Sequence, residues 1–176
     1  ACVILAFQMR ARQQLRPGGN FAQALQAGRF VITAEISPPL SCARADLVMA
    51  IRPLKGIADA VNVTDGASAR VHMSALAAAS IMVEEGVEPI LQMTCRDRNR
   101  IALQSDLLGA AALGVRNFLM LRGNDPAKGD QPEAKPVFDL DTREPARSQW
   151  ERSDVAAVAA CSVICEAMLA ITIADA

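Results

Sequence analysis

A strand pattern followed by a helix pattern recurs about every 30 residues along the middle of this chain, and no hairpin signal interrupts it. The strand patterns are short apolar runs at residues 29–36, 58–63, 89–95 and 117–121. Helix patterns lie at residues 21–27, 43–54, 72–85 and between Asn99 and Gly114. Consecutive strands joined by helices run parallel with right-handed crossovers, so the repeat predicts an α/β fold with a parallel sheet.

Apolar residues at helical spacing predict which face of each helix packs on the sheet. Asp97 or Asn99 is expected to cap the last helix at its N-terminus, and Gly114 is expected to end it. The residues expected to face the sheet are Leu47, Ile51 and Leu54 in one helix, Met73, Leu76, Ala77 and Ile81 in the next, and Ile101, Gln104, Leu108, Ala111 and Ala112 in the last.

Composition supports the same architecture and excludes some classes of partner. With 176 residues the chain is long enough to bury roughly two-thirds of its unfolded surface. Hydrophobic residues make up 52% and aromatic residues only 3%, which favours helices packed on a sheet over a β-sandwich. The net charge of −1 provides no basic field, so no nucleic-acid partner is expected.

The cysteines and the start of the chain favour a cytoplasmic protein. The five cysteines (2, 42, 95, 161 and 165) are odd in number and lack CxxC spacing, which predicts reduced thiols and no metal site. The apolar stretch Cys2–Phe7 precedes basic residues, in the opposite order to a signal peptide. The chain begins at Ala1 rather than Met, which suggests an excised or partial reading frame.

An apolar run of 19 residues lies near the end, at residues 155–173. That length is just enough to cross a bilayer. Glu166 near its middle would be costly in lipid, and the many alanines lower the driving force for insertion. The run therefore predicts a buried helix or one that seeks a protein partner, with a membrane-tethered module as the alternative and no membrane partner expected.

Glu35 is the first candidate for chemistry, because it interrupts an apolar strand near its carboxyl end. A carboxyl group among apolar neighbours has a raised pKa, which suits a general acid near neutral pH. The alternative is a solvated carboxylate, or one paired with an arginine.

Polar residues also follow the other strands. Thr64-Asp65-Gly66-Ala67 forms a turn where Gly66 permits close approach of the backbone to a ribityl or phosphate group, although Asp65 could equally be a turn former. Gln92 and Thr94 share one face of their strand and need hydrogen-bond partners from protein or ligand.

Arg122-Gly123-Asn124 follows the fourth strand and is a plausible cradle for a pyrophosphate. The alternative for Arg122 is an ion pair with Asp97 or Asp125. A further set of arginines is expected to be solvated or paired with neighbouring carboxylates, namely Arg96, Arg98 and Arg100.

Five blocks of sequence, in this order and at this spacing, resemble the methylenetetrahydrofolate reductase family, in particular its short bacterial form. The resemblance covers about residues 21–141. The blocks are FVITAEISPP (30–39), VNVTDGA (61–67), QMTCRDRNRIALQSDLLG (92–109), LRGNDP (121–126) and GDQPEAKPVFDLD (129–141).

The resemblance implies a (β/α)₈ TIM-type barrel that binds FAD at the carboxyl ends of its strands. It implies a cytoplasmic oxidoreductase in which NADH or NADPH reduces the flavin, and the flavin reduces 5,10-methylenetetrahydrofolate to 5-methyltetrahydrofolate for methionine synthesis. Glu35 matches the general acid of the family, and Gln92 stands where some members carry a flavin-contacting histidine. The residues expected to bind the cofactor are Thr64, Asp65, Ala67, Gln92, Arg122, Gly123, Asn124 and Val137.

The chain departs from the family in two respects. Asn124 stands where the family usually has aspartate, so either Asp125 replaces it through a shifted loop or the flavin chemistry is weakened. Only about four βα units are present, and nothing after about Asp141 resembles the family. We therefore expect an irregular extension at 1–20, a partial barrel at 21–141, and a divergent tail with an apolar helix at 142–176.

A half-barrel leaves two sheet edges open, and the unpaired backbone groups of such edges favour association with another chain. The resemblance implies a folate substrate and NAD(P)H as partners. The open edges add further copies of the chain in a homo-oligomer as an expected partner. The alternative function is a non-catalytic half-barrel that acts by self-association or by pairing with another barrel half.

Overall fold

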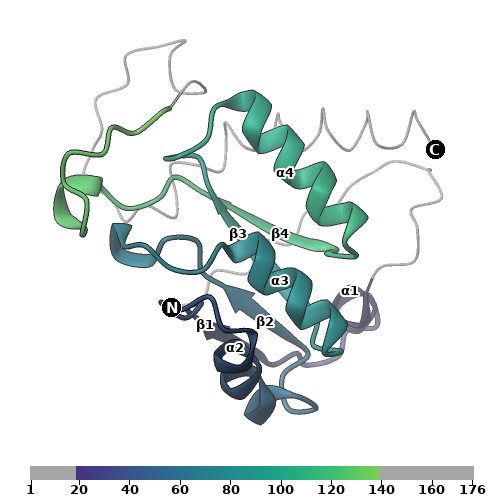
Figure 1. Cartoon of the computed structure of the whole chain (residues 1–176). Coiled ribbons are helices and arrows are strands. Elements are labelled where there is room, and N and C mark those ends of the chain that lie inside the picture. Colours follow the sequence, from purple (N-terminus) through teal and green to yellow (C-terminus); the bar gives the residue numbers. More distant parts are fainter. Residues whose placement is uncertain (1–18, 139–176) are drawn as a thin grey trace.

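The computed structural model of the chain describes residues 19–138, in which helices and strands alternate (Figure 1). The strands are β1 (Thr33–Ile36), β2 (Ala60–Val63), β3 (Pro89–Thr94) and β4 (Asn117–Leu121). The α-helices are α1 (Asn20–Gln26), α2 (Arg44–Ile51), α3 (Ala75–Glu84) and α4 (Arg100–Ala112). Short 3₁₀ helices are η1 (Arg52–Leu54), η2 (Ala67–Ala69) and η3 (Pro126–Lys128).

The four strands form one parallel sheet in the order β1-β2-β3-β4. The predicted α/β class and parallel pairing are therefore confirmed. Each strand pairs with the next one in the sequence, as in a (β/α) barrel, whereas the strand order of a doubly wound sheet reverses direction. The register places Glu35 beside Asn62 and Gln92 beside Leu119.

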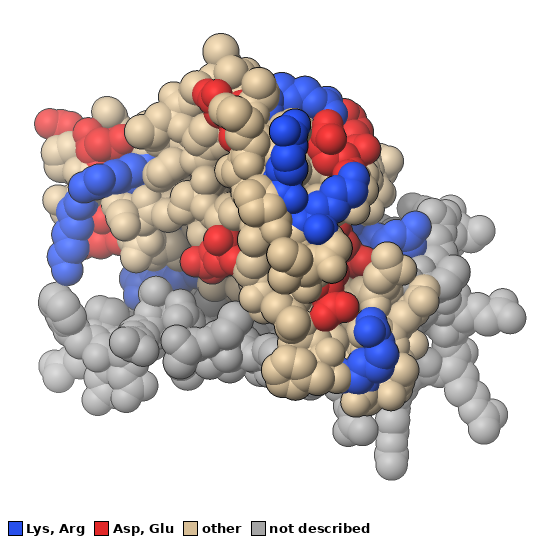
Figure 2. Space-filling view, turned by 90° about the horizontal axis from the view of Figure 1, so that it is seen from below, with Lys and Arg blue, Asp and Glu red and all other residues tan. Residues whose placement is uncertain are grey.

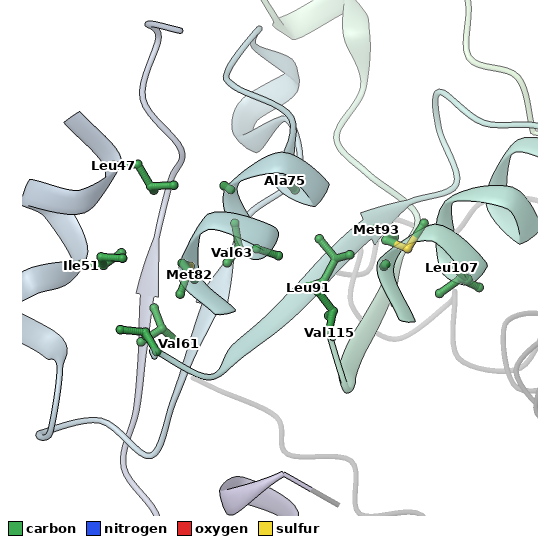
Figure 3. Packing of buried hydrophobic residues seen from close by; sticks show 14 of the residues in the cluster. Leu47, Ile51, Val61, Val63, Ala75, Met82, Leu91, Met93, Leu107 and Val115 are labelled. Carbon is green, nitrogen blue, oxygen red and sulfur yellow. The ribbon is translucent and has the colours of Figure 1, made fainter. Parts of the chain in front are cut away.

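Helices α2, α3 and α4 cover one face of this sheet (Figure 1). The hydrophobic core lies between these helices and the sheet, where side chains from β2 and β3 meet those from the helices (Figure 3). Strand residues alternate between faces, so Val61, Val63, Leu91 and Met93 face the helices. The residues between them, such as Gln92, face the opposite side of the sheet.

The predicted face of α4 is wrong by one residue. Leu103, Leu107 and Ala110 are buried against the sheet, whereas Ile101 is 77% exposed and Leu108 51% exposed. The helix carries two apolar stripes about 100° apart, since Leu107 and Leu108 are adjacent. Periodicity alone therefore could not show which stripe faces the sheet.

The other helices agree better with the prediction. In α2, Leu47 and Ile51 are buried, and Leu54 packs on the core from η1. In α3 the predicted stripe is mostly half-buried and Ala77 is exposed. The fully buried residues lie beside that stripe. The prediction missed them because α3 has alanine on every face, which weakens the amphipathic signal. They are Ala75, Ala78, Ala79 and Met82.

The first strand is shorter than predicted. β1 begins at Thr33 rather than at residue 29, and Phe30 is 90% exposed. The carboxylate of Asp59 accepts the backbone N–H of Ile32 at 2.8 Å, so a side chain takes a donor that the ladder would otherwise use. The predicted helix 72–85 likewise starts later, because the extended backbone of Ser74 precedes Ala75.

Several predictions lie outside the described residues, namely those for 1–18, for 139–141 and for the divergent tail 142–176 with its apolar run 155–173. Cys42 and Cys95 both have free thiols. In the described part of the chain no helix combines the length and the apolarity needed to cross a membrane.

The corrected face of α4 can be tested by two truncations in one helix. Leu103→Ala should lower the free energy of unfolding by about 2–5 kcal/mol, because a fully buried leucine leaves a cavity. Ile101→Ala should change it by less than about 0.5 kcal/mol, because the side chain is exposed. Urea unfolding of both variants measures this, and the reverse ranking would restore the sequence-based face.

Candidate functional site

Two of the predicted site residues meet on the sheet face opposite the helices. The Gln92 Nε2 atom donates a hydrogen bond to Glu35 Oε2 at 3.1 Å, across the intervening strand β2. Gln92 is 7% exposed, whereas the side chain of Glu35 is exposed. The apolar surroundings expected for Glu35 are thus absent in the described part of the chain, because its neighbours Ala34 and Ile36 turn toward the core.

Thr64 and Asp65 join the end of β2 to its neighbours. The Thr64 hydroxyl donates to Ser37 Oγ at 3.0 Å, which ties β2 to the segment after β1. Asp65 Oδ2 accepts the Thr94 backbone N–H at 2.8 Å and the Thr94 hydroxyl at 3.0 Å. Both residues therefore connect the ends of neighbouring strands, whether or not they also contact a ligand.

Arg98 completes this link from the other side. Its Nη1 atom lies 2.5 Å from Asp65 Oδ2, and its Nε atom donates to Asp106 Oδ2 at 2.8 Å. Burial is the largest single influence and lowers the pKa of Arg98, but the hydrogen bonds and charges of Asp65 and Asp106 together outweigh it, so the pKa of Arg98 is raised. Arg98 was expected to be solvated or paired, and only the pairing is confirmed, because its side chain is 17% exposed.

Arg96 has the most buried charged side chain of the site, at 7% exposure. Its Nε and Nη2 atoms each donate to a different oxygen of Asp97 at 2.7 Å, a bidentate pair. Its Nη1 atom donates to the carbonyls of Asn124 at 3.2 Å and Gly66 at 3.5 Å. The hydrogen bonds to Asp97 raise the pKa of Arg96, and the same bonds lower the pKa of Asp97.

Gly66 and Gly123 make room for this arginine. Both have positive φ, and a Cβ added at Gly66 would lie 2.6 Å from Arg96 Nη2. A Cβ at Gly123 would lie 2.9 Å from Arg96 Cβ and 3.1 Å from Thr94 Cβ. The space beside Gly66, where the sequence predicts close approach of a ligand to the backbone, is lined by the side chain of Arg96.

Asn124 holds a strained turn. Its Oδ1 atom accepts the backbone N–H of Ser68 at 3.1 Å, and both Ser68 and Ala69 have positive φ. Asp125 instead caps η3 by accepting the N–H of Ala127 at 3.0 Å. Asp125 thus has a local role of its own, and the structure gives no sign of a shifted loop that puts it in place of Asn124.

Arg122 and Val137 lie at the edge of the site. The Arg122 guanidinium sits 5.2 Å from the centroid of the Phe138 ring, and it forms no ion pair with a carboxylate within residues 19–138. The alternative of a pair with Asp97 or Asp125 is therefore wrong. The Val137 N–H donates to the Arg96 carbonyl at 2.7 Å, which brings this segment beside the loops.

Sequence reasoning missed the central position of Arg96 and Arg98. Both follow the end of β3 in a run of alternating charges, a pattern that normally indicates a solvated segment. The available signal was the pair of glycines at 66 and 123, whose missing side chains left space for a large one. On the face of the molecule in Figure 2, basic and acidic side chains lie next to one another.

Groups that remain able to meet a ligand are the exposed ones. They include the Glu35 carboxylate, the Arg122 guanidinium and the Asn124 side-chain amide nitrogen. Among residues 19–138, no cluster of His, Cys, Asp or Glu is suited to a metal ion. The arrangement is that of an α/β protein with an acid, a cation and an amide at the carboxyl ends of parallel strands.

Comparison with known proteins identifies the family. A family model described as methylenetetrahydrofolate reductase matches residues 20–143, which is well over half of the chain. The chain belongs to the methylenetetrahydrofolate reductase family. The resemblance found in the sequence blocks is thereby confirmed, and a reductase of folate chemistry is the kind of function that membership supports.

A shorter similarity links the chain to two curated proteins named chorismate synthase. The one from Thermotoga sp. (strain RQ2) is 40% identical over 79 residues, which are 44% of this chain and 21% of that protein. The one from Thermotoga maritima is 39% identical over 79 residues, with the same shares covered. The chain spans about a fifth of the length of these relatives, so the similarity assigns no activity to it.

The pair of Arg96 and Asp97 should make stability depend on acid pH. Because the folded pKa of Asp97 is lowered, its stabilisation is complete above about pH 3.9, the ordinary value of an unfolded aspartate. This stabilisation is lost as the pH falls through the pKa of Asp97 in the folded chain. The difference in unfolding free energy between the native chain and Asp97→Asn should be present at pH 7 and shrink toward zero below about pH 4.

Urea unfolding across this pH range measures the difference. In a matched background with Arg96→Met, the Asp97→Asn substitution should cause a clearly smaller pH-dependent change, because the main partner of the carboxylate is gone while Arg98 and Thr94 remain. A pH-dependent difference of undiminished size in that background would show that Arg96 is not the main partner of Asp97.

Proposed function

We propose that this chain takes part in flavin-dependent reduction of 5,10-methylenetetrahydrofolate to 5-methyltetrahydrofolate, with NADH or NADPH as electron donor. Family membership supports this reaction, and the contact between Glu35 and Gln92 is the observation that carries it. We also propose that the sheet is part of a (β/α)₈ barrel and that the protein works in the cytoplasm. The consecutive parallel strand order supports the barrel.

The cofactor in this proposal is FAD, which when bound would carry electrons from the nicotinamide to the folate. The described residues fit such a group in part, because an exposed cation and an exposed amide lie beside each other at the end of β4. Polar groups at the ends of β2 and β3 are mostly engaged with protein partners, so they would shape the site. The residues proposed to bind FAD are Thr64, Asp65, Ala67, Gln92, Arg122, Gly123, Asn124 and Val137.

Glu35 is the proposed general acid. Its carboxyl group lies exposed on the face of the sheet that the helices leave open, where a substrate can reach it. Gln92 donates one hydrogen bond to it and so fixes its position through a neutral group, without adding a cation beside it. Glu35 would give its proton to the nitrogen that leaves the methylene carbon. The bonding pair stays with that nitrogen, and an iminium forms at the other one.

The Glu35→Gln substitution separates the two halves of this reaction. It should lower folate reduction by about 10²–10⁴-fold, since a general acid is lost. It should leave FAD binding and NADH oxidation with menadione roughly unchanged, because neither step needs the proton. Absorbance of bound flavin and steady-state rates with each electron acceptor measure these outcomes.

Glu84→Gln is the matched control, because Glu84 is an exposed glutamate that pairs with Arg44 far from the open face. It should leave both rates unchanged. Equal folate reduction in the Glu35 and Glu84 variants would remove the catalytic role of Glu35. A native chain that neither binds FAD nor oxidises NADH would contradict the proposed function as a whole.

A second candidate function is a non-catalytic half-barrel that acts by pairing with another copy of the chain. Within residues 19–138, β1 pairs only with β2, and β4 pairs only with β3, so the described sheet has two outer edges. Unpaired strand edges favour association through backbone hydrogen bonds.

The oligomeric state tests this second candidate. Sedimentation equilibrium should show a concentration-dependent dimer or larger species if sheet edges pair between copies. A well-folded monomer at all accessible concentrations would rule the pairing out, and it would leave the proposed reductase unaffected.

A further inference from the structure

Arg96 is a buried cation that hydrogen-bonds to loop backbones as well as to the carboxylate of Asp97. Its guanidinium reaches the carbonyl of Gly66 after β2 and the carbonyl of Asn124 after β4. Its own carbonyl accepts the N–H of Val137 at 2.7 Å. One residue at the end of β3 therefore contacts three segments that are distant in the sequence.

The geometry of these contacts requires an arginine. A guanidinium has five donors in a planar fork, so it can hold Asp97 with two of them and still reach two carbonyls. A lysine ammonium is a compact charge on a flexible stem and cannot span the same set of acceptors. Asp97 supplies the counter-charge that permits burial of the cation.

The surrounding backbone is shaped to this side chain. Gly66 and Gly123 both have positive φ, and any side chain at either position would collide with Arg96. The strained turn at Ser68 lies next to Gly66 and is held by Asn124, whose carbonyl Arg96 also binds. Displacement of the guanidinium would therefore release both loops together.

We propose that Arg96 is the positioning residue whose side chain holds the Gly66 and Asn124 segments in the arrangement that receives the cofactor. This inference rests on the proposed function, because Asn124 is among the residues proposed to bind FAD. Arg96 is itself buried and acts through these segments rather than by touching the ligand.

The test compares Arg96→Lys and Arg96→Met with Arg44→Met in the full chain. Arg44 also pairs with carboxylates, but it lies on the surface and is the matched control. Hydrogen exchange is measured at the amide of Ser68, which Asn124 holds, with Leu91 in β3 as the reference for global opening. The dissociation constant for FAD is measured by quenching of flavin fluorescence.

Both Arg96 variants should speed exchange at Ser68 by about tenfold or more and weaken FAD binding by about tenfold or more, since the hydrogen bonds from the guanidinium to the Gly66 and Asn124 carbonyls are lost. Leu91 should remain protected in Arg96→Lys, which keeps the charge beside Asp97. The Arg44 variant should match the native chain in both measurements.

Unchanged exchange at Ser68 in both variants would overturn the proposal. Equal loss of protection at Leu91 in Arg96→Lys would also overturn it, because Arg96 would then stabilise the whole fold rather than these loops. A native chain that binds no FAD would contradict the proposed function and the cofactor part of this inference. The exchange measurements would still decide whether Arg96 holds the loops.

Discussion

The loops at the carboxyl ends of the strands depend on the burial of one positive charge. A buried cation is costly unless a counter-ion and hydrogen-bond acceptors replace the water it loses. Asp97 supplies the counter-ion for Arg96, and the carbonyls of Gly66 and Asn124 supply the remaining acceptors. Since the acceptors belong to different loops, satisfying the charge also fixes where those loops lie.

Other polar side chains of the site also connect separate segments of the chain. Asp65 accepts from Thr94 and Arg98 before any ligand is present, and Asn124 holds the turn at Ser68. Residues proposed to bind the cofactor therefore also stabilise the loops in which they lie. A substitution at such a residue changes the frame of the site as well as a contact with the cofactor, and its effects on affinity and on stability need to be measured together.

The sequence predicted the sheet well, because strand order follows from the repeat of strand and helix patterns alone. It predicted the face of α4 wrongly, because adjacent leucines at 107 and 108 fit two stripes equally well. Glu35 and Gln92 were identified as separate candidates, but their contact spans β2 and depends on sheet twist and register. The position of Arg96 depends on glycines that are 30 residues before it and 27 residues after it, a relation that no local pattern contains.

The consecutive pairing of the strands also bears on how the chain can assemble. Each strand adds to the one synthesised just before it, so every pairing in the described sheet closes a short loop with a modest entropy cost. On a ribosome, β2 could pair with β1 as soon as β2 itself had emerged, before β3 and β4 were made. Vectorial synthesis and sheet growth thus run in the same direction.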